Sequence, residues 1–417
     1  MIDSEPVITV FEHQLLRLGD APEGVPFTEA RWQVLVQLHP QLPRPYYTLT
    51  HRGIKLSHYV GVLKTPNFTL EVLPKADAHP EPAVWRRLLI DMVATCASLS
   101  VNHAAVATPS FRADSLLEVY LLDFLNQVER LFRQGLIKQY QSVAENCFAA
   151  KGRLRFAQQV RRNAVHQERF FVEHAVHTID HPLHQLLKKA LRVVANASSN
   201  PSIKQRTRHL LLSLASVSDA SLERLASARI TFDRHTERYR TAVTAAQQIL
   251  AASFSHVYQG NTHQGFAFML DMNRLFEEFV YRRLQRLSIA HGFSVHRQTT
   301  QSLWGTTNAR PDILVKFSEG QKNVVIDTKW KVLLQPRPSA EDLHQIYVYN
   351  QLFEAERGIL LYPRVHDLSQ RQHRFGGPGH TSAEVHFISI ADPQQARINP
   401  QLDHLLLQML EPPPESK

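Results

Sequence analysis

The chain has 417 residues, 43% of them hydrophobic, which is enough for two or three packed domains. Its formal charge of +9 favours contact with a polyanion such as DNA, although many basic proteins bind none. With two cysteines, no signal peptide and no apolar run of membrane-spanning length, the sequence excludes a disulfide-rich secreted protein and a membrane protein, so we expect it in the cytoplasm.

Residues 1–110 are expected to form a mostly β N-terminal domain. Short apolar runs are separated there by turn residues, a pattern typical of strands. The runs lie at 7–11, 32–36, 46–50, 60–63 and 68–73. A helix is expected to follow at 82–98.

Residues 111–258 change to helical spacing and indicate a helical middle region. Gly135 is a natural stop for its first helix. Further helices are expected at 182–197, 203–215 and 235–253. The basic segment 151–163 is partly extended, and it fits DNA contact and a solvated charged face about equally well.

Four histidines in this region, at positions 174, 177, 181 and 184, have metal-like spacing. Pro182 at a helix start, with Asp180 as its cap, divides them between two elements. No cysteine or acid cluster completes a zinc set, so we expect ordinary surface histidines.

The most informative stretch lies within residues 259–417. Asp312 begins the apolar run 313–317, and Asp327 and Lys329 end the next one, 324–329. The turn-type residues between the runs predict a hairpin that brings Asp312 near Asp327. Because side chains alternate along a strand, Asp327 and Lys329 are expected on one side and Thr328 on the other.

This pattern is the layout of a metal-dependent phosphodiesterase. Two converging carboxylates hold Mg²⁺ through oxygen ligands, and a nearby lysine orients or activates water and offsets charge on the phosphorus. A bare Asp-x-Lys is common, however, so an exposed hairpin with surface charges is the alternative on this motif alone.

Helices are expected on both sides of the motif. Residues 270–284 have a helical apolar stripe with Asp271 as N-cap, and Glu277 lies beside that stripe within reach of the metal site. A second helix opens with a capping box from Ser339 to Asp342, and Gln345 and Tyr349 share one of its faces. With the strand 358–363 that follows, an α/β core with one acidic edge is predicted.

The sequence contains no G-x-x-x-x-G-K-[ST] loop to hold nucleotide phosphates. We therefore do not expect this chain to bind or hydrolyse GTP by itself.

With these motifs the chain resembles the McrC family, the nuclease subunits of the McrBC modification-dependent (5-methylcytosine) restriction system, which carry a PD-(D/E)xK core. The nuclease motif alone is shared by many unrelated enzymes, whereas the combination is more specific and covers nearly the whole chain. The matching segments are 275–277, 310–312, 326–331, 342–345 with Tyr349, 59–63, 70–75, 135–136 and 151–154.

The resemblance implies a PD-(D/E)xK nuclease core over 259–417, a mixed sheet flanked by helices. It makes Asp312 and Asp327 ligands of Mg²⁺, with Glu277 as a supporting carboxylate of the same metal site. Lys329 is the catalytic lysine it implies, and Gln345 and Tyr349 flank the site.

The resemblance also implies partners and a function. The chain is expected to bind, through its N-terminal domain, a separate McrB-like AAA+ GTPase hexamer and to stimulate its hydrolysis. The expected function is that of the Mg²⁺-dependent DNA endonuclease subunit of a type IV restriction complex, cutting double-stranded DNA with modified cytosine as the GTPase translocates. A second copy of the chain is expected for double-strand cleavage.

Two other interpretations stay open at this stage. The chain is then either a non-catalytic DNA-binding or regulatory subunit of the ring, or a stand-alone PD-(D/E)xK nuclease of DNA repair. The complete Asp…Asp-x-Lys set argues against the first, and cutting that needs no GTP is the signature of the second.

Overall fold

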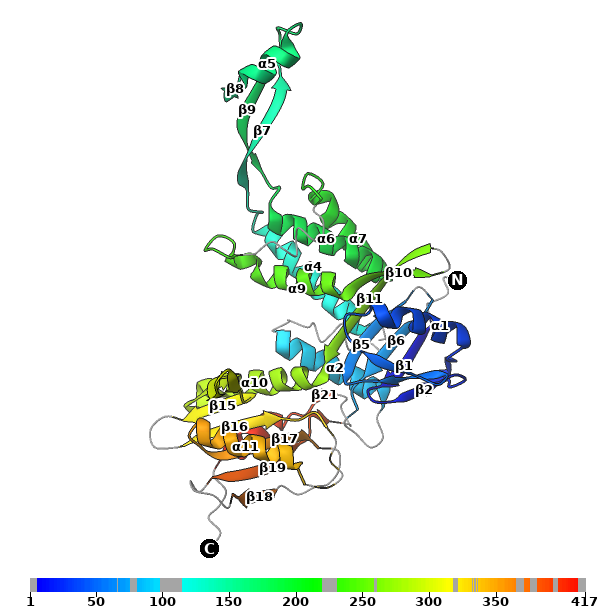
Figure 1. Cartoon of the computed structure of the whole chain (residues 1–417), viewed down its shortest axis with the longest axis vertical. Helices are drawn as coiled ribbons and strands as arrows, with labels where there is room; N and C mark the ends of the chain where they lie inside the picture. The colour runs from blue at the N-terminus through cyan, green and yellow to red at the C-terminus, as the bar shows by residue number, and fades with distance from the viewer. Residues whose placement is uncertain are drawn as a thin grey trace. The chain divides into compact units, whose positions relative to one another are not determined.

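The computed structural model describes residues 6–65, 67–75, 81–97, 115–219, 231–258, 261–317, 322–331, 333, 335, 337–364, 371–375, 381–392 and 397–411 (Figure 1). Two compact units are present, one formed by Met1–Val119 with Phe254–Lys417 and the other by Tyr120–Ser253. Of the helices in these described ranges, none combines the length and apolar character needed to cross a membrane.

The N-terminal part of the first unit contains two sheets. Four of the predicted strands are confirmed there. One sheet has the order β1-β6-β5-β11-β10, formed by β1 (Val7–Phe11), β6 (Thr69–Leu73), β5 (Tyr59–Lys64), β11 (Asn261–Asp271) and β10 (Ser253–Tyr258). The other has the order β2-β4-β3, formed by β2 (Leu15–Arg17), β4 (Gly53–Leu56) and β3 (Tyr47–Thr50).

The strand predicted at 32–36 is wrong, because these residues belong to helix α1 (Glu29–Leu38). Its aromatic and β-branched residues favour a strand locally. Val34, Leu35 and Leu38, however, are buried on one helical face. Burial against the sheets therefore outweighs the local preference. Short 3₁₀ turns flank the helix at η1 (Pro22–Gly24) and η2 (His39–Gln41).

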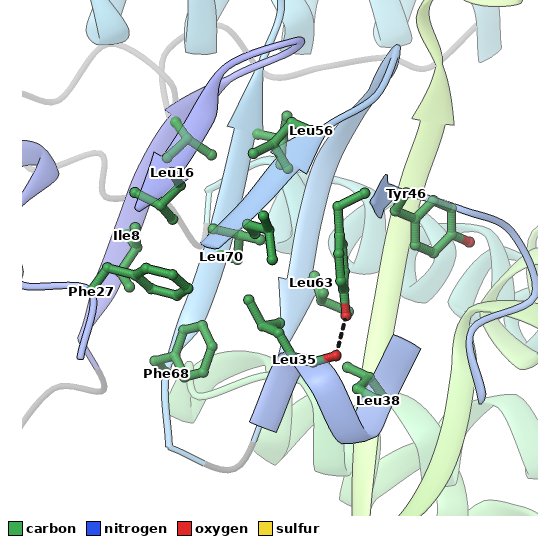
Figure 2. Close-up of a cluster of buried hydrophobic side chains, with 14 of the residues drawn as sticks. Ile8, Leu16, Phe27, Leu35, Leu38, Tyr46, Leu56, Leu63, Phe68 and Leu70 are labelled. Atoms are coloured by element: carbon green, nitrogen blue, oxygen red, sulfur yellow. Dashed lines mark hydrogen bonds between the residues drawn. The ribbon is translucent and has the colours of Figure 1, made fainter. Parts of the chain in front are cut away.

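Helix α1 and the two sheets enclose one hydrophobic core. Leu35 and Leu38 of the helix pack beside strand residues such as Ile8, Leu56 and Leu63 (Figure 2). The buried hydroxyl of Tyr47 donates to the carbonyl of Leu35 at 2.8 Å, which satisfies a polar group inside the core.

Strand β11 lies within residues 259–417, which were expected to form the nuclease region. It pairs antiparallel with β5, Met269 opposite Gly61, and so belongs to the N-terminal sheet. Asp271 ends β11 and caps helix α10 (Met272–His291) as predicted, accepting from the amides of Asn273 and Arg274 at 3.0 and 3.3 Å. The N-terminal sheet therefore leads directly into the helix that carries Glu277.

The C-terminal part of the first unit is a mixed α/β fold, as predicted. Its six-stranded sheet has the order β12-β15-β16-β17-β19-β18. The strands are β12 (Phe293–Arg297), β15 (Ile313–Phe317), β16 (Asn323–Thr328), β17 (Ala355–Pro363), β19 (Ser382–Ile388) and β18 (Arg371–Arg374). Two small pairs accompany it, β13 (Gln301–Trp304) with β14 (Thr307–Ala309) and β20 (Ala391–Asp392) with β21 (Arg397–Ile398).

The predicted hairpin is confirmed by antiparallel pairing of β15 and β16, with Ile313 opposite Ile326. Strands β16, β17 and β19 are mutually parallel. Helix α11 begins with the predicted capping box of Ser339 and Asp342. The described residues of this unit also form helices α2 (Pro82–Ala97), α11 (Ala340–Leu352) and α12 (Leu402–Leu410). Residue 98 of the predicted helix 82–98, and 318–321 of the turn predicted within the hairpin, lie outside the described residues.

The second unit combines helices with a sheet. Its helices match the predicted ones closely: α4 (Ser115–Arg133), α6 (Pro182–Ala197), α7 (Pro201–Ser213) and α9 (Arg240–Ala252), the last preceded by η3 (Glu237–Tyr239). Gly135 follows α4 with a φ of 81°, the conformation expected of a helix stop.

The middle region is not only helical, because three antiparallel strands lie within it. Strands β7 (Gln139–Cys147) and β9 (Phe170–Thr178) pair along their full length, and β8 (Arg153–Leu154) adds to β9. Helix α5 (Phe156–Asn163) lies at the end of this sheet away from α6 and α7 (Figure 1). The basic segment thus forms one strand and one short helix.

Two expectations about the histidines of this unit are wrong. His184 is fully buried, with its ring nitrogens 2.6 Å from the carbonyl of Ile179 and 2.9 Å from the hydroxyl of Tyr239. The N-cap of α6 is His181, whose side chain accepts from the amide of Leu183, and not Asp180. Pro182 does open the helix. Tertiary packing therefore gives His184 two polar partners inside the unit.

We predict that Gly61→Ala lowers the free energy of unfolding by about 3 kcal/mol. Gly61 has a φ of 137°, and a Cβ there lies 2.1 Å from the backbone carbonyl oxygen of Phe268. Gly24→Ala is the matched control, because Gly24 has a φ of 81° and open space around it, and we expect a cost of about 1 kcal/mol. Urea unfolding followed by circular dichroism measures both. Equal costs for the two variants contradict the packing argument.

Candidate active site

Asp327 is buried near the end of β16, between the neighbouring strands β15 and β17, with 2% of its surface exposed. Lys329, two residues later, places Nζ 2.7 Å from Oδ2 of Asp327. The predicted placement of both side chains on one side of the chain is therefore confirmed. Burial raises the pKa of Asp327, while the nearby Lys329 lowers it, and the net shift is upward.

Asp312 lies directly before β15 and is held by the residue that follows Asp327. Because Ile313 pairs with Ile326, Asp312 and Asp327 are the next neighbours outward in the hairpin. The amide and the hydroxyl of Thr328 both donate to Oδ2 of Asp312 at 2.8 Å. Burial and the negative charge of Asp327 raise the pKa of Asp312 to about 6. The two carboxylates are therefore electrostatically coupled.

Glu277 approaches the two aspartates from α10. It is buried and accepts hydrogen bonds from Nε2 of Gln298 at 2.8 Å and from Nε of Arg297 at 3.2 Å. Burial, and then the charge of Asp312, raise its pKa. The adjacent Glu278 lies about 100° further around the helix and pairs with Arg282 at 2.7 Å, but it also pairs with Arg297 and so shares that guanidinium with Glu277.

Gln345 and Tyr349 connect α11 to both halves of the motif. Lys329 Nζ donates to Gln345 Oε1 at 3.1 Å, and Gln345 Nε2 donates to the Tyr349 hydroxyl at 2.7 Å. That hydroxyl donates to the carbonyl of Arg310 at 3.1 Å, two residues before Asp312. All six predicted site residues therefore gather at one place.

Asp342 also belongs to this site, although its sequence position indicated only a helix cap. Its carboxylate lies 2.7 Å from Nζ of Lys331 and 3.5 Å from Nζ of Lys329. Burial raises the pKa of Asp342, but hydrogen bonds from Lys331 and Ser339 outweigh it and lower the pKa to about 2. No sequence signal joins Asp342 to the lysines, because the connecting segment has no regular period.

The positive charge of Lys329 is stabilised by these acids. Burial by itself lowers the pKa of Lys329, but the carboxylates of Asp327 and Asp342, with Asp312 further away, raise it above its ordinary value. The ammonium group therefore stays protonated at neutral pH and supplies a fixed cation beside Asp327.

Trp330 anchors the segment after Lys329 in the N-terminal part of the same unit. Its indole Nε1–H donates to Oε1 of buried Glu12 at 2.6 Å, and the amide of Lys75 donates to the same oxygen at 2.8 Å. The rings of Trp85 and Phe276 meet Trp330 edge-on, at centroid distances of 6.5 and 5.2 Å. With 318 positions between Glu12 and Trp330, no local pattern predicts this contact.

The donor set fits a hard divalent cation. Asp312 and Asp327 supply carboxylate oxygens from neighbouring strands, and Glu277 is close enough for its charge to act on both. Burial, and then the negative charges of neighbouring acids, raise the pKa values of these carboxyl groups, and a bound Mg²⁺ would offset that cost. Within the described ranges no preformed group of three or more His, Cys, Asp or Glu ligands occurs. Lys329, Thr328 and Arg297 are partners of the three acids in this structure.

A comparison with known protein families identifies the family of the chain. The family model of the McrBC 5-methylcytosine restriction system component matches residues 54–363, about three quarters of the chain. The chain belongs to the McrBC family. The matched range contains Asp312, Asp327 and Lys329 as well as the whole second unit.

One solved structure shows a similar fold. It is a half-complex from a tetradecameric assembly of Thermococcus gammatolerans McrB AAA+ hexamers with bound McrC: the matched chain is 20% identical, with a TM-score of 0.69 over 97% of this chain and 99% of that one. A chain of the T. gammatolerans McrBC complex is 22% identical, with a TM-score of 0.49 over 67% of this chain and 87% of that one. None of the curated proteins compared with this McrBC family member matches it.

We predict that Glu12 makes the stability of the McrBC family member fall as the pH rises from about 5 to 8. Burial raises the pKa of Glu12 from 4.5 to about 7, against the hydrogen bonds from Trp330 and Lys75. Between these pH values the folded state holds a proton that the unfolded chain has lost, so the free energy of unfolding decreases as pH increases. The decrease is at most about 3 kcal/mol.

Urea unfolding of wild type and Glu12→Gln at pH 5 and pH 8 measures this effect. The variant keeps an oxygen acceptor for Trp330 but does not titrate, so the part of the pH dependence due to Glu12 should disappear. Glu29→Gln, at an exposed position in the first turn of α1, should retain the wild-type difference. A Glu12→Gln protein that loses as much stability as wild type over this range contradicts the assignment.

Proposed function

We propose that the chain is the DNA endonuclease subunit, of McrC type, of a modification-dependent restriction complex, and that the C-terminal part of the first unit, from α10 onward, holds a PD-(D/E)xK nuclease core. The observation that supports this most is the convergence of Asp312 and Asp327 beside the ammonium group of Lys329. A purely structural hairpin has no need to place a buried and a half-buried carboxylate side by side, because burying a charge costs several kcal/mol unless it is compensated.

In this proposal Asp312 and Asp327 would hold Mg²⁺, with Glu277 as a supporting carboxylate. When bound, the ion polarises the scissile phosphate and lowers the pKa of coordinated water. Lys329 positions the attacking water and offsets the negative charge that develops on the phosphate oxygens. In-line attack on phosphorus then displaces the 3′ oxygen.

Gln345 and Tyr349 are positioning residues in this mechanism. Gln345 accepts from Lys329 Nζ and donates to Tyr349, whose hydroxyl is fixed to the carbonyl of Arg310. This chain of hydrogen bonds restricts the lysine to one orientation without adding a negative charge. Because the donor is already fixed in place, no free energy of reorganisation is needed when negative charge develops on the phosphate.

The family of the chain and the absence of a phosphate-binding loop from its sequence support a complex in which a separate GTPase drives cleavage. We propose that the N-terminal part binds a McrB-like AAA+ GTPase hexamer, stimulates its hydrolysis, and receives double-stranded DNA with modified cytosine during translocation. One site cuts one strand, so double-strand cleavage requires two copies of the chain.

Asp327→Asn should reduce DNA cleavage at least about a hundredfold, because it removes a metal-ligand charge that acts in the transition state. The assay uses the full chain with its partner ring, GTP and Mg²⁺ on methylated duplex DNA. Glu341→Gln is the control, since it removes an exposed acid from the first turn of α11 without touching the site. Cleavage by Asp327→Asn at the wild-type rate would sink the catalytic assignment and leave a regulatory subunit.

Asp312→Asn should weaken divalent metal binding by the isolated full chain at least about tenfold, because half of the carboxylate pair loses its charge. Calorimetric titration with Mn²⁺ and Mg²⁺ measures this without any turnover. Glu341→Gln again serves as the control. If Asp312→Asn binds the metal as tightly as wild type, Asp312 is not a ligand.

A further inference from the structure

A small hairpin projects from the chain directly before Asp312. Strands β13 and β14 pair only with each other and are not part of the six-stranded sheet. At its tip Trp304 is 83% exposed and Leu303 48% exposed, and Gly305 turns the chain with a φ of 53°. By contrast, Trp85 and Trp330 are buried, at 3% and 6% exposure.

Both ends of this hairpin are fastened to the candidate active site. On the entering side, Gln298 donates its side-chain amide to Glu277 at 2.8 Å and its backbone N–H to the carbonyl of Asp312 at 3.0 Å. On the leaving side, Ala309 is buried in the cluster that contains Tyr349, and the next carbonyl accepts from the Tyr349 hydroxyl. The base of the hairpin is therefore held in a defined position relative to the two aspartates, with the tip a few residues beyond it.

The chemistry of the hairpin suits a nucleic acid. Residues 298–308 have no charged side chain, so nothing in them repels phosphate. Their Gln, Ser, Thr and Asn side chains are groups that donate hydrogen bonds to phosphate oxygens. An exposed indole ring stacks on a base or wedges between base steps at the cost of local unstacking.

We propose that Trp304, supported by Leu303, contacts the substrate duplex beside the cleavage position as an aromatic wedge. This inference rests on the proposed function, because it takes duplex DNA as the substrate of the adjacent acids. Two apolar side chains are too few for a stable protein–protein interface, which buries about 1,200 Å² or more. One ring face is enough to stack on a single base.

The test measures binding of the full chain to a short fluorescent duplex by anisotropy, with the metal chelated so that no cleavage occurs. Trp304→Ala should bind about tenfold more weakly, in line with the loss of one stacked base, and Trp304→Phe should stay within about threefold of wild type. Ile289→Ala is the matched control, since it removes an equally exposed apolar side chain, at the end of α10, and should bind like wild type.

Tryptophan fluorescence gives a second readout. In wild type, saturating duplex should protect part of the emission from acrylamide quenching, and Trp304→Phe should abolish that protection. Unchanged affinity in Trp304→Ala, or no protection in wild type, overturns the inference. A variant that binds DNA normally but loses the partner ring also overturns it and assigns the tip to a protein contact.

The results separate this inference from the proposed function. Weaker binding by Trp304→Ala together with normal cleavage by Asp327→Asn supports the contact of Trp304 with duplex DNA, but overturns the catalytic assignment and with it the position beside the cleavage site. Normal binding by Trp304→Ala with cleavage lost in Asp327→Asn overturns the wedge alone. A wild-type chain without affinity for the duplex overturns both.

Discussion

The buried carboxylate of Asp327 is the constraint on which the rest of the site depends. A charge at 2% exposure is tolerable only with close compensation. Lys329 supplies that compensation at 2.7 Å, and Gln345 fixes the ammonium group by a further hydrogen bond. Asp342 holds Lys331 and approaches Lys329, so the acids and lysines form one alternating network. The residues of the proposed active site therefore also stabilise the fold at this end of the central strands.

Two connections join this network to the N-terminal part of the same unit. Strand β11 pairs with β5 and then continues into α10, which carries Glu277. Trp330 follows Lys329 and donates to Glu12, directly after β1. Both connections run from the N-terminal sheet to residues beside the acids. A change in that sheet, such as binding of a partner, thus has a direct physical route to the proposed active site.

Much of the candidate site was predictable because its signals are local. Alternation along β16 places Asp327 and Lys329 together, the hairpin brings Asp312 beside them, and helical spacing aligns Gln345 with Tyr349. Local preference also misleads. The run at 32–36 favours a strand but forms α1, since Val34, Leu35 and Leu38 bury one helical face, and His184, expected at the surface, is enclosed by partners from other segments.

The sequence by itself determined the α/β character of the C-terminal region, the hairpin and the helix caps at Asp271 and Ser339, because each depends on residues close together in the chain. It also predicted six residues for the proposed site, whose roles stay a prediction. Only the tertiary structure decided that Trp330 binds Glu12 and that Asp342 pairs with the lysines. It also decided that β11 belongs to the N-terminal sheet and that the hairpin of Trp304 is attached to Glu277 and Asp312 through Gln298. These contacts join segments that are not related by a regular spacing in the sequence. They form because buried charges and apolar side chains need partners, and the fold brings those partners from distant parts of the chain.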